Sequence, residues 1–330
     1  MSNRLNWIDN LRAIACIMVV MIHSTSYYVA TGLSVGEMNW SVANLLNSAS
    51  RVCVPLFFMI SGYLFFGEKS ARKKHFLRIT LCVLFYSLIS LIYIAVFTRI
   101  GFWPSLKSLL LKPVFYHLWF FYAIIVIYLL SPLIAVKQVS AGYLAAIVVI
   151  LGVVANPNMV SLSWHGVHLL PVNLYVVGDT FYYLLYALMG RAIGMLDTGR
   201  RGVSWAAALI FFASIIAIAL STHRQTLING NFADTFYAYC GPLVFIAALS
   251  LFVWCKNCLT FTLPSLRLIA ENSLAIYGFH AVIINFIRGH KLDFTHWPVL
   301  DIAYIFMTAL LLSLLLSMGL HRLDRHRLMS

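Results

Sequence analysis

Charged side chains are scarce in this chain of 330 residues, and acidic ones are the scarcest. Charged residues make up 10% of the sequence, with 10 Asp and Glu against 23 Lys and Arg, whereas hydrophobic residues make up 62%. A water-soluble globule needs far more charge on its surface. Because the Lys and Arg residues stand beside hydrophobic runs, they indicate membrane topology and contact with anionic lipid headgroups, and no nucleic-acid partner is expected.

The sequence also lacks the cysteine spacing of a zinc site. Its six cysteines are scattered, and Cys255 and Cys258 form a lone C-x-x-C with no further pair of ligands at suitable spacing. No internal repeat is evident to inspection, which removes one common signature of transporters without excluding a transporter. The first apolar run contains His23 and has no clean cleavage site, so we expect a membrane helix there, not a cleaved signal.

Long apolar runs are what the sequence has in abundance. Runs able to cross about 30 Å of hydrocarbon recur along its whole length and leave little for a soluble domain. We therefore predict one domain, residues 1–330, with an all-α fold: a polytopic membrane helix bundle of about ten transmembrane helices. The predicted spans are about 11–30, 43–66, 76–98, 117–136, 141–155, 175–195, 203–221, 236–254, 267–287 and 299–321, of which the fifth is short.

The distribution of Lys and Arg orients this predicted bundle. With the N-terminus inside, sixteen of the 23 Lys and Arg residues fall on the cytoplasmic side and seven on the outer side. Positive charge concentrates on the cytoplasmic side of membrane proteins, so we expect both termini in the cytoplasm. The stretch 156–174 contains no Lys or Arg, which fits an outer loop.

One face of the first predicted helix carries three ionisable residues. Arg12 and His23 are eleven residues apart, which returns to within about 20° of the same helix face, and Asp9 precedes Arg12 by three. The imidazole would lie about 16 Å deeper than the guanidinium. A charge at the bilayer centre costs about 2.5–3.5 kcal/mol on insertion scales, so such groups usually face a bundle interior. The alternative is that Asp9 and Arg12 are interfacial anchors and His23 a hydrogen-bonded core residue.

The predicted topology sorts the polar residues of the spans into two groups. A mainly basic group on the cytoplasmic side, which suits a phosphorylated ligand, comprises Asp9, Arg12, Ser61, residues 69–78 and Arg191. An outer group, which suits proton transfer and hydroxyl binding, comprises His23, Arg51, His117, Asp179 and His280. His23 and His280 fall at depths that agree to about 2 Å, so we expect them to share one cavity in a polar interior.

These residues also have simpler explanations. The basic run 69–78 follows from the positive-inside rule as well, and Arg51 could snorkel outward from its helix. His117 also suits an interfacial position, and Asp179 suits the first turn of a helix. His280 could simply form a hydrogen bond with a neighbouring helix.

Four motifs in order resemble a known family. They are residues 8–15 followed by His23, then 55–65, 117–121 and 273–280. With them the chain resembles the membrane acyltransferase-3 family over essentially its full length. The resemblance implies about ten helices in the cell inner membrane. It also implies transfer of an acyl group from cytoplasmic acetyl-CoA to a hydroxyl of a periplasmic or lipid-linked glycan, with the N-acetylglucosamine of enterobacterial common antigen as the expected acceptor.

The resemblance also assigns roles to residues. The arginine-to-histidine motif of the family falls on Arg12 and His23, and the histidine is the implied catalytic group. Many glycan-modifying members carry a Glu shortly after the His-x-Trp motif, where this chain has Ala123 and Ile124. The usual carboxylate partner is therefore missing, and Asp179 is the candidate replacement.

We accordingly expect three sets of site residues. The catalytic set is His23, His280 and Asp179. The set that binds acetyl-CoA is Asp9, Arg12, Ser61, Arg72 and Arg78. The set that binds the acceptor is Arg51, His117, Trp119 and Tyr277. Acetyl-CoA is expected as a co-substrate, with no permanently bound cofactor and no metal.

Elementary chemistry agrees with these roles but leaves alternatives. An imidazole with a pKa near 6.5 can take the proton of an attacking alcohol, and the phosphates of CoA suit Arg and Lys. Direct transfer and an acyl-histidine relay both stay open. The competing functions are a polyprenyl-linked glycan flippase or a proton-coupled transporter, which intramembrane His, Asp and Arg would also serve. A membrane scaffold without catalysis is the third hypothesis.

Overall fold

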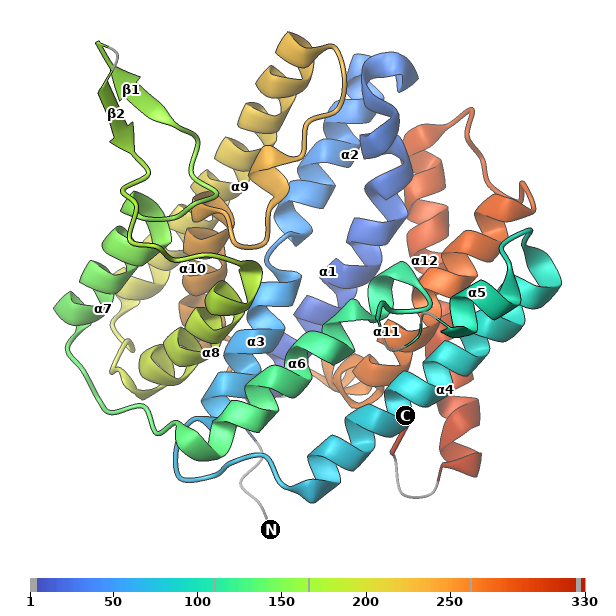
Figure 1. Cartoon of the computed structure of the whole chain (residues 1–330), viewed down its shortest axis with the longest axis horizontal. Helices are drawn as coiled ribbons and strands as arrows, with labels where there is room; N and C mark the ends of the chain where they lie inside the picture. The colour runs from blue at the N-terminus through green and yellow to red at the C-terminus, as the bar shows by residue number, and fades with distance from the viewer. Residues whose placement is uncertain are drawn as a thin grey trace.

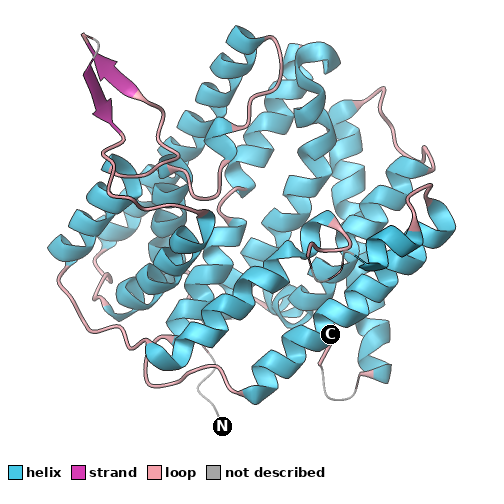
Figure 2. Cartoon of the chain, in the orientation of Figure 1, coloured by secondary structure: helices cyan, strands magenta, loops and turns pink. Residues whose placement is uncertain are grey.

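A computed structural model of the chain describes residues 5–107, 109, 111–165, 167–261, 263–324 and 328–329. Within these residues the regular structure is helical apart from one short pair of strands, as Figure 2 shows. The predicted all-α class is confirmed. Of the basic residues assigned above to the cytoplasmic side, Arg4, Arg325 and Arg327 lie outside the described residues.

The regular elements follow one another as short and long helices around a single hairpin (Figure 1). The α-helices are α1 (Asn6–Thr31), α2 (Glu37–Ser50), α3 (Cys53–Phe65), α4 (Lys73–Phe97), α5 (Phe102–Lys107), α6 (Trp119–Leu130), α7 (Ala141–Ile147), α8 (Asp179–Met195), α9 (Arg201–Asn229), α10 (Pro242–Cys258), α11 (Pro264–Gly289) and α12 (Pro298–Leu323). The π-helical stretch Val148–Val154 continues α7. Short 3-10 turns lie at Gly32–Val35, Tyr116–Leu118, Ser131–Leu133 and Thr235–Tyr237. The antiparallel strands are β1 (Leu162–Trp164) and β2 (Val167–Leu170).

Eight helical segments of the described chain are long and apolar enough to cross a membrane, so the molecule is a polytopic membrane bundle. They are Asn6–Val35, Glu37–Phe65, Lys73–Phe97, Tyr116–Leu133, Arg201–Asn229, Thr235–Cys258, Pro264–Gly289 and Pro298–Arg322. Each coincides with one of the ten predicted spans.

The other two predicted spans are present as shorter helices. The range 141–155 holds the helix Ala141–Val154, and the range 175–195 holds α8, which has 17 residues. At 1.5 Å per residue α8 is about 25 Å long, less than the thickness of a hydrocarbon core. It starts later than predicted because Gly178, with a φ of 84°, ends the irregular segment before it.

The two ends of the described chain lie on one face of the bundle. In Figure 1 α1 begins and α12 ends at the lower edge, whereas the hairpin of β1 and β2 stands at the upper edge. We call these the terminal face and the hairpin face. Helices α1 and α11 both start near the terminal face and end towards the hairpin face. The position of a residue along either helix therefore gives its depth in the bundle.

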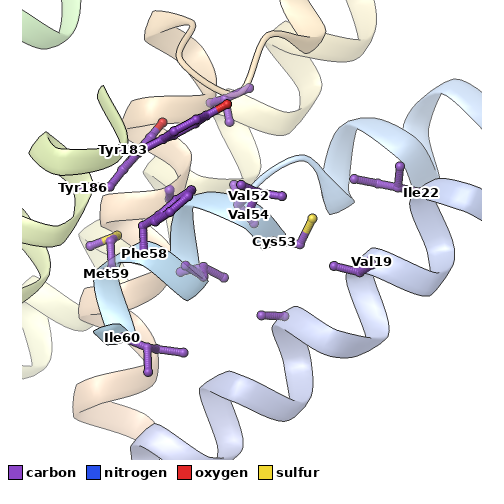
Figure 3. Close-up of a cluster of buried hydrophobic side chains, with 14 of the residues drawn as sticks. Val19, Ile22, Val52, Cys53, Val54, Phe58, Met59, Ile60, Tyr183 and Tyr186 are labelled. Atoms are coloured by element: carbon purple, nitrogen blue, oxygen red, sulfur yellow. The ribbon is translucent and has the colours of Figure 1, made fainter. Parts of the chain in front are cut away.

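The core is built where α1, α3 and α8 meet. Figure 3 shows Val19 and Ile22 of α1 beside Cys53 at the start of α3. Further along α3, the ring of Phe58 stacks on Tyr183 of α8 with centroids 4.5 Å apart. All except Tyr183 are less than 9% exposed, and Tyr183 is 9% exposed. Helix α3 is thus packed between α1 and α8.

Two glycines allow α3 and α8 to approach closely. A methyl group at Gly62 would overlap the backbone of Ala187, and one at Gly190 would overlap the backbone of Met59. Small residues at such a crossing let the two helix backbones touch, as they commonly do in membrane bundles. This explains the glycine within residues 55–65, the second of the four sequence motifs.

Buried amides fix the position of α1. Asn47 of α2 donates to the carbonyl oxygen of Ile22 at 3.2 Å and to the hydroxyl of Thr25 at 2.8 Å. At the other end, Asn10 donates to the carbonyl oxygen of Leu259 at 2.9 Å. Buried polar groups of this kind are costly to leave unpaired, so they specify the rotation and depth of the helix. That rotation decides where His23 points.

Candidate active site

A cavity of about 390 Å³ enters the bundle near the terminal face. Arg12, Ser61 and Arg78 lie on its wall near the terminal ends of α1, α3 and α4, and Tyr277 of α11 lies at its inner end. Much of the remaining wall is apolar or aromatic, as is common in sites for small organic molecules. We call it the terminal cavity.

A second cavity, of about 720 Å³, lies near the hairpin face. We call it the hairpin-side cavity. It is lined by His23, Ser26, Tyr27, Tyr116, Ile284, Asn285, Arg288, Lys291, Asp293, Thr295 and His296. Ten of these eleven residues carry a polar group, so this cavity differs in chemistry from the first.

Helix α11 connects the two cavities. Its residues up to Tyr277 line the terminal cavity, and its residues from Ile284 onward line the hairpin-side cavity. Tyr277 and Ile284 are separated by about 10 Å along the helix axis. His280 lies between them and is fully buried. On α1, Arg12 lines the first cavity and His23 the second, so the two cavities approach each other from opposite faces.

Three imidazoles fill the space between the cavities. The ring centroids of His23 and His280 are 5.1 Å apart, and those of His280 and His117 are 5.2 Å apart. Tyr277 adds a fourth ring, 5.8 Å from His280, and its hydroxyl donates to the carbonyl oxygen of His117. The predicted proximity of His23 and His280 is therefore observed, and His117 joins them, but His280 is fully buried and lines neither cavity.

Hydrogen bonds to carbonyl groups set the tautomers of two of these rings. Nδ1 of His280 lies 3.0 Å from the carbonyl oxygen of Ile276, and Nε2 of His117 lies 3.2 Å from that of Gly278. A carbonyl oxygen only accepts, so each of these nitrogens carries a proton. The other nitrogens, Nε2 of His280 and Nδ1 of His117, are buried without a hydrogen-bond partner in the described chain. In the neutral form of each ring, this second nitrogen carries a lone pair.

His23 is the imidazole that reaches a cavity. It is partly exposed and lines the hairpin-side cavity, whereas His117 and His280 are buried behind it. Its ring also lies 5.1 Å from that of Tyr116. A ligand in this cavity can touch His23, and the ring centroid of the buried His280 lies 5.1 Å from that of His23. This is the geometry of a general base with a second base behind it.

The residues expected to bind acetyl-CoA gather at the terminal face. Arg12 and Arg78 line the terminal cavity, and Arg12 forms an ion pair with Asp9 at 3.1 Å. Ser61 lines the same cavity and donates to the carbonyl oxygen one turn before it. Arg72 lines a neighbouring cavity of about 310 Å³. Glu271, which the sequence did not single out, also lines the terminal cavity.

Arg51 and Trp119 each lie near the ring of Tyr239, away from both cavities. Arg51 lies at the break between α2 and α3, where Nε donates to the amide oxygen of Asn47 at 2.8 Å. Its guanidinium carbon is 5.7 Å from the ring centroid of Tyr239, which is 6.1 Å from that of Trp119. Both residues were expected to bind the acceptor, and neither lines the terminal cavity or the hairpin-side cavity.

Asp179 and Tyr277 lie elsewhere than their expected roles suggest. Asp179 is exposed in the first turn of α8, and none of the interactions of the described residues joins it to the imidazoles. Tyr277, expected at the acceptor, lines the terminal cavity. Ile124 lines that cavity as well, so the position where many family members carry a Glu is apolar in space as it is in sequence.

Several residues of the hairpin-side cavity were missed in the sequence. Arg288 forms ion pairs with Asp293 at 2.8 Å and with Asp301 at 2.7 Å, and Tyr27 lies beside it. Asp301 gave a signal that could have been used, because a carboxylate inside an apolar membrane run needs a partner. That its partner is the guanidinium of Arg288 follows only from the tertiary structure.

The described residues contain no group of three or more His, Cys, Asp or Glu that could hold a metal ion. Cys255 and Cys258 are both free thiols.

Comparison with known proteins gives one match along nearly the whole chain. Residues 5–319 match the family of acyltransferase domains known as acyltransferase-3. A stretch of 242 residues, 65% of this chain, is 26% identical to 32% of a serine/alanine racemase of Enterococcus gallinarum. A stretch of 139 residues, 38% of this chain, is 32% identical to 19% of an amino-acid racemase of Enterococcus faecalis. The chain thus spans about a third and a fifth of the lengths of these two relatives. No solved structure matches it.

Proposed function

The chain belongs to the acyltransferase-3 family and is a multi-pass membrane acyltransferase, and from that premise we propose that it transfers an acetyl group from acetyl-CoA to a glycan hydroxyl. The observation that carries the proposal is the pair of cavities that approach one imidazole cluster from opposite faces. The terminal face is cytoplasmic, in agreement with the Lys and Arg count, and the membrane is the cell inner membrane.

The donor, acetyl-CoA, occupies the terminal cavity. Arg12, Arg78 and the nearby Arg72 bind its phosphates, and the ion pair with Asp9 orients the guanidinium of Arg12. The pantetheine arm follows the apolar wall inward towards Tyr277, passing Ser61. The thioester then lies at the inner end of the cavity, against the imidazole cluster, where the acceptor hydroxyl at His23 meets it.

The acceptor enters the hairpin-side cavity and presents one hydroxyl to His23. His23 takes the hydroxyl proton as the oxygen attacks the thioester carbonyl, a C–O bond forms, the C–S bond breaks, and the CoA thiolate regains a proton. In the alternative route the acetyl group first bonds to an imidazole nitrogen and is then passed to the hydroxyl. Both routes give an O-acetyl glycan and CoA.

The two buried imidazoles assist His23. Nε2 of His280, which has a free lone pair, orients His23 and shares the proton that His23 acquires. His117 supports His280 from behind and does not touch the acceptor. We route no step through Asp179, because its carboxylate is exposed at the start of α8. The pair of imidazoles takes the place of the missing carboxylate.

The proposed acceptor is a cell-envelope glycan, with the N-acetylglucosamine of enterobacterial common antigen as the specific candidate. The racemase activities named for the two Enterococcus proteins are not proposed here, because this chain covers only 32% and 19% of their lengths. A glycan flippase remains the rival. A flippase must pass a whole sugar from one face to the other, past the buried ring of His280, whereas acetyl transfer needs only one hydroxyl and the thioester to meet at the imidazole cluster.

The test uses purified protein in lipid nanodiscs with acetyl-CoA and a lipid-linked N-acetylglucosamine. We expect free CoA, measured by a thiol reagent, and O-acetylated sugar, measured by mass spectrometry, in equal amounts. In proteoliposomes the sugar lipid should stay in its leaflet. Movement of the sugar lipid between leaflets without CoA release would establish the flippase instead.

A further inference from the structure

The hairpin-side cavity contains a prebuilt group of side chains around Arg288. Its guanidinium forms ion pairs with Asp293 at 2.8 Å and Asp301 at 2.7 Å. Its central carbon lies 4.5 Å from the ring centroid of Tyr27 and 5.2 Å from that of Tyr28. The side chain of Arg288 is 15% exposed and that of Asp293 is 12% exposed, so both retain a small surface towards the cavity they line.

A fully buried carboxylate fixes this group. Asp301 accepts hydrogen bonds from the hydroxyl of Tyr28 at 2.7 Å and from the backbone N–H of Phe294 at 2.7 Å. Together with Arg288, these contacts tie α1, α11, α12 and the loop between the last two helices at one point. A cavity wall built in this way is preorganised, so little conformational entropy is lost when a ligand binds.

The charge of the group points to an uncharged ligand. Asp293 and Asp301 together outweigh the single positive charge of Arg288, and the exposed Lys291 restores balance at the rim. A phosphate or a carboxylate would meet a guanidinium that is already neutralised twice. A neutral molecule with many hydroxyl groups would find both hydrogen-bond donors and acceptors on the cavity wall, including the amide of Asn285.

Tyr27 gives the site a flat apolar surface beside these polar groups. Its ring is 48% exposed and lines the cavity. It follows His23 by four residues, so both side chains lie on one face of α1, about 6 Å apart along the axis. A pyranose that lies with its C–H face on the Tyr27 ring therefore has its hydroxyls within reach of His23.

We infer that Tyr27, Arg288 and Asp293 form a subsite for a neutral pyranose, such as an N-acetylhexosamine, and that this subsite selects against uronic acids and sugar phosphates. The inference rests on the proposed function and names the acceptor class of the same site. Asp301 and Tyr28 act as positioning residues that hold Arg288. Tyr27 binds one face of the sugar, and Asp293 accepts hydrogen bonds from its hydroxyls.

The experiment compares Tyr27→Ala and Tyr27→Trp in nanodiscs, with octyl N-acetyl-β-glucosaminide as acceptor and octyl β-glucuronide as its anionic counterpart. Tyr27→Ala should raise the acceptor KM about tenfold, the effect expected of losing one aromatic stacking partner, with kcat and the Kd for acetyl-CoA little changed. Tyr27→Trp should keep the wild-type KM. Tyr175→Ala, which removes an exposed tyrosine on the segment before α8, is the matched control.

A second variant and a binding measurement separate the possible failures. Asp293→Asn should also raise the acceptor KM, and the glucuronide should bind more weakly than the glucosaminide to the wild-type protein. Saturation-transfer NMR without acetyl-CoA measures glycoside binding whether or not transfer occurs. Binding that depends on Tyr27 without any acetyl transfer would refute the proposed function and keep the subsite. An unchanged acceptor KM in Tyr27→Ala, or preference for the glucuronide, would refute the subsite.

Discussion

The arginines of the two cavities differ in their ion pairs. At the terminal cavity Arg12 forms an ion pair with Asp9 on a wall that also holds Arg78 and Glu271, whereas at the hairpin-side cavity Arg288 forms ion pairs with Asp293 and Asp301. Because Asp301 is fully buried, the second arrangement uses the guanidinium to hold a wall together. An arginine beside a cavity therefore does not by itself indicate an anion site.

The cavities also differ in their distance from the reacting groups. The terminal cavity ends at Tyr277, and its basic residues lie near the terminal face, remote from the imidazoles. The hairpin-side cavity has His23 in its own wall. Substitutions at the terminal face should therefore change affinity for the donor, and substitutions in the cluster should change turnover. The four predictions below test that division, from the largest expected effect to the smallest.

His23→Ala should lower acetyl transfer by a factor of about 10²–10⁴, the usual contribution of a general base, while the Kd for acetyl-CoA stays near the wild-type value. The measurement is the rate of CoA release with the glycoside acceptor. His168→Ala, which removes an exposed histidine of β2, is the control. Turnover within a few-fold of wild type would remove His23 from the mechanism.

His280→Ala should lower kcat by about tenfold or more, and lower it more than it weakens acetyl-CoA binding. The reason is that the ring centroid of His280 lies 5.1 Å from that of His23, while His280 lines neither cavity. His280→Asn retains a donor for the Ile276 carbonyl and should recover part of the loss. A variant that loses donor affinity but keeps kcat would place His280 with the donor instead.

Arg12→Ala and Arg78→Ala should each weaken acetyl-CoA binding by about tenfold, because each removes a charged hydrogen-bond partner of a phosphate. The measurement is isothermal titration of acetyl-CoA into the protein in nanodiscs. Lys73→Ala, in the first turn of α4 and not on the cavity wall, serves as control and should do little. Unchanged affinity in both arginine variants would show that the terminal cavity does not hold the donor phosphates.

Asp179→Asn should change the transfer rate by no more than about twofold, as expected for an exposed group away from the chemistry. The rate of CoA release measures it, with Asp179→Ala as a second variant. A loss of about a hundredfold would instead restore the catalytic role that the sequence suggested for this carboxylate. It would also mean that α8 contributes directly to the imidazole cluster.

The fold class and part of the site could be predicted because they depend on local rules. A run of apolar residues must form a helix in a bilayer, so eight predicted spans coincide with long helices. Arg12 and His23 share one helix, and helical periodicity alone puts them on one face. Depth in the membrane brought His23 and His280 together, 257 residues apart in sequence, because the bilayer supplies a common reference for every span.

The depth of a residue in the membrane did not predict its neighbours where the rotation of its helix determines them. Asp179, His117 and Arg51 were all assigned to the outer half, yet only His117 reaches the imidazoles, and it does so from behind His280. Hydropathy gives the position of a residue along the membrane normal, but not the direction in which its helix turns it. That direction is set by packing, here by the close crossing of α3 and α8 and by Asn47 against α1.

The sequence by itself determined that this is a membrane bundle of helices with ionisable groups at two depths, since run length and periodicity are properties of single segments. Only the tertiary structure decided which of those groups meet. It paired Arg288 with Asp293 and Asp301, placed Tyr27 beside them, and left the lone pairs of His117 and His280 free. These contacts join residues of separate helices, and their free energy depends on a mutual position that no single segment specifies.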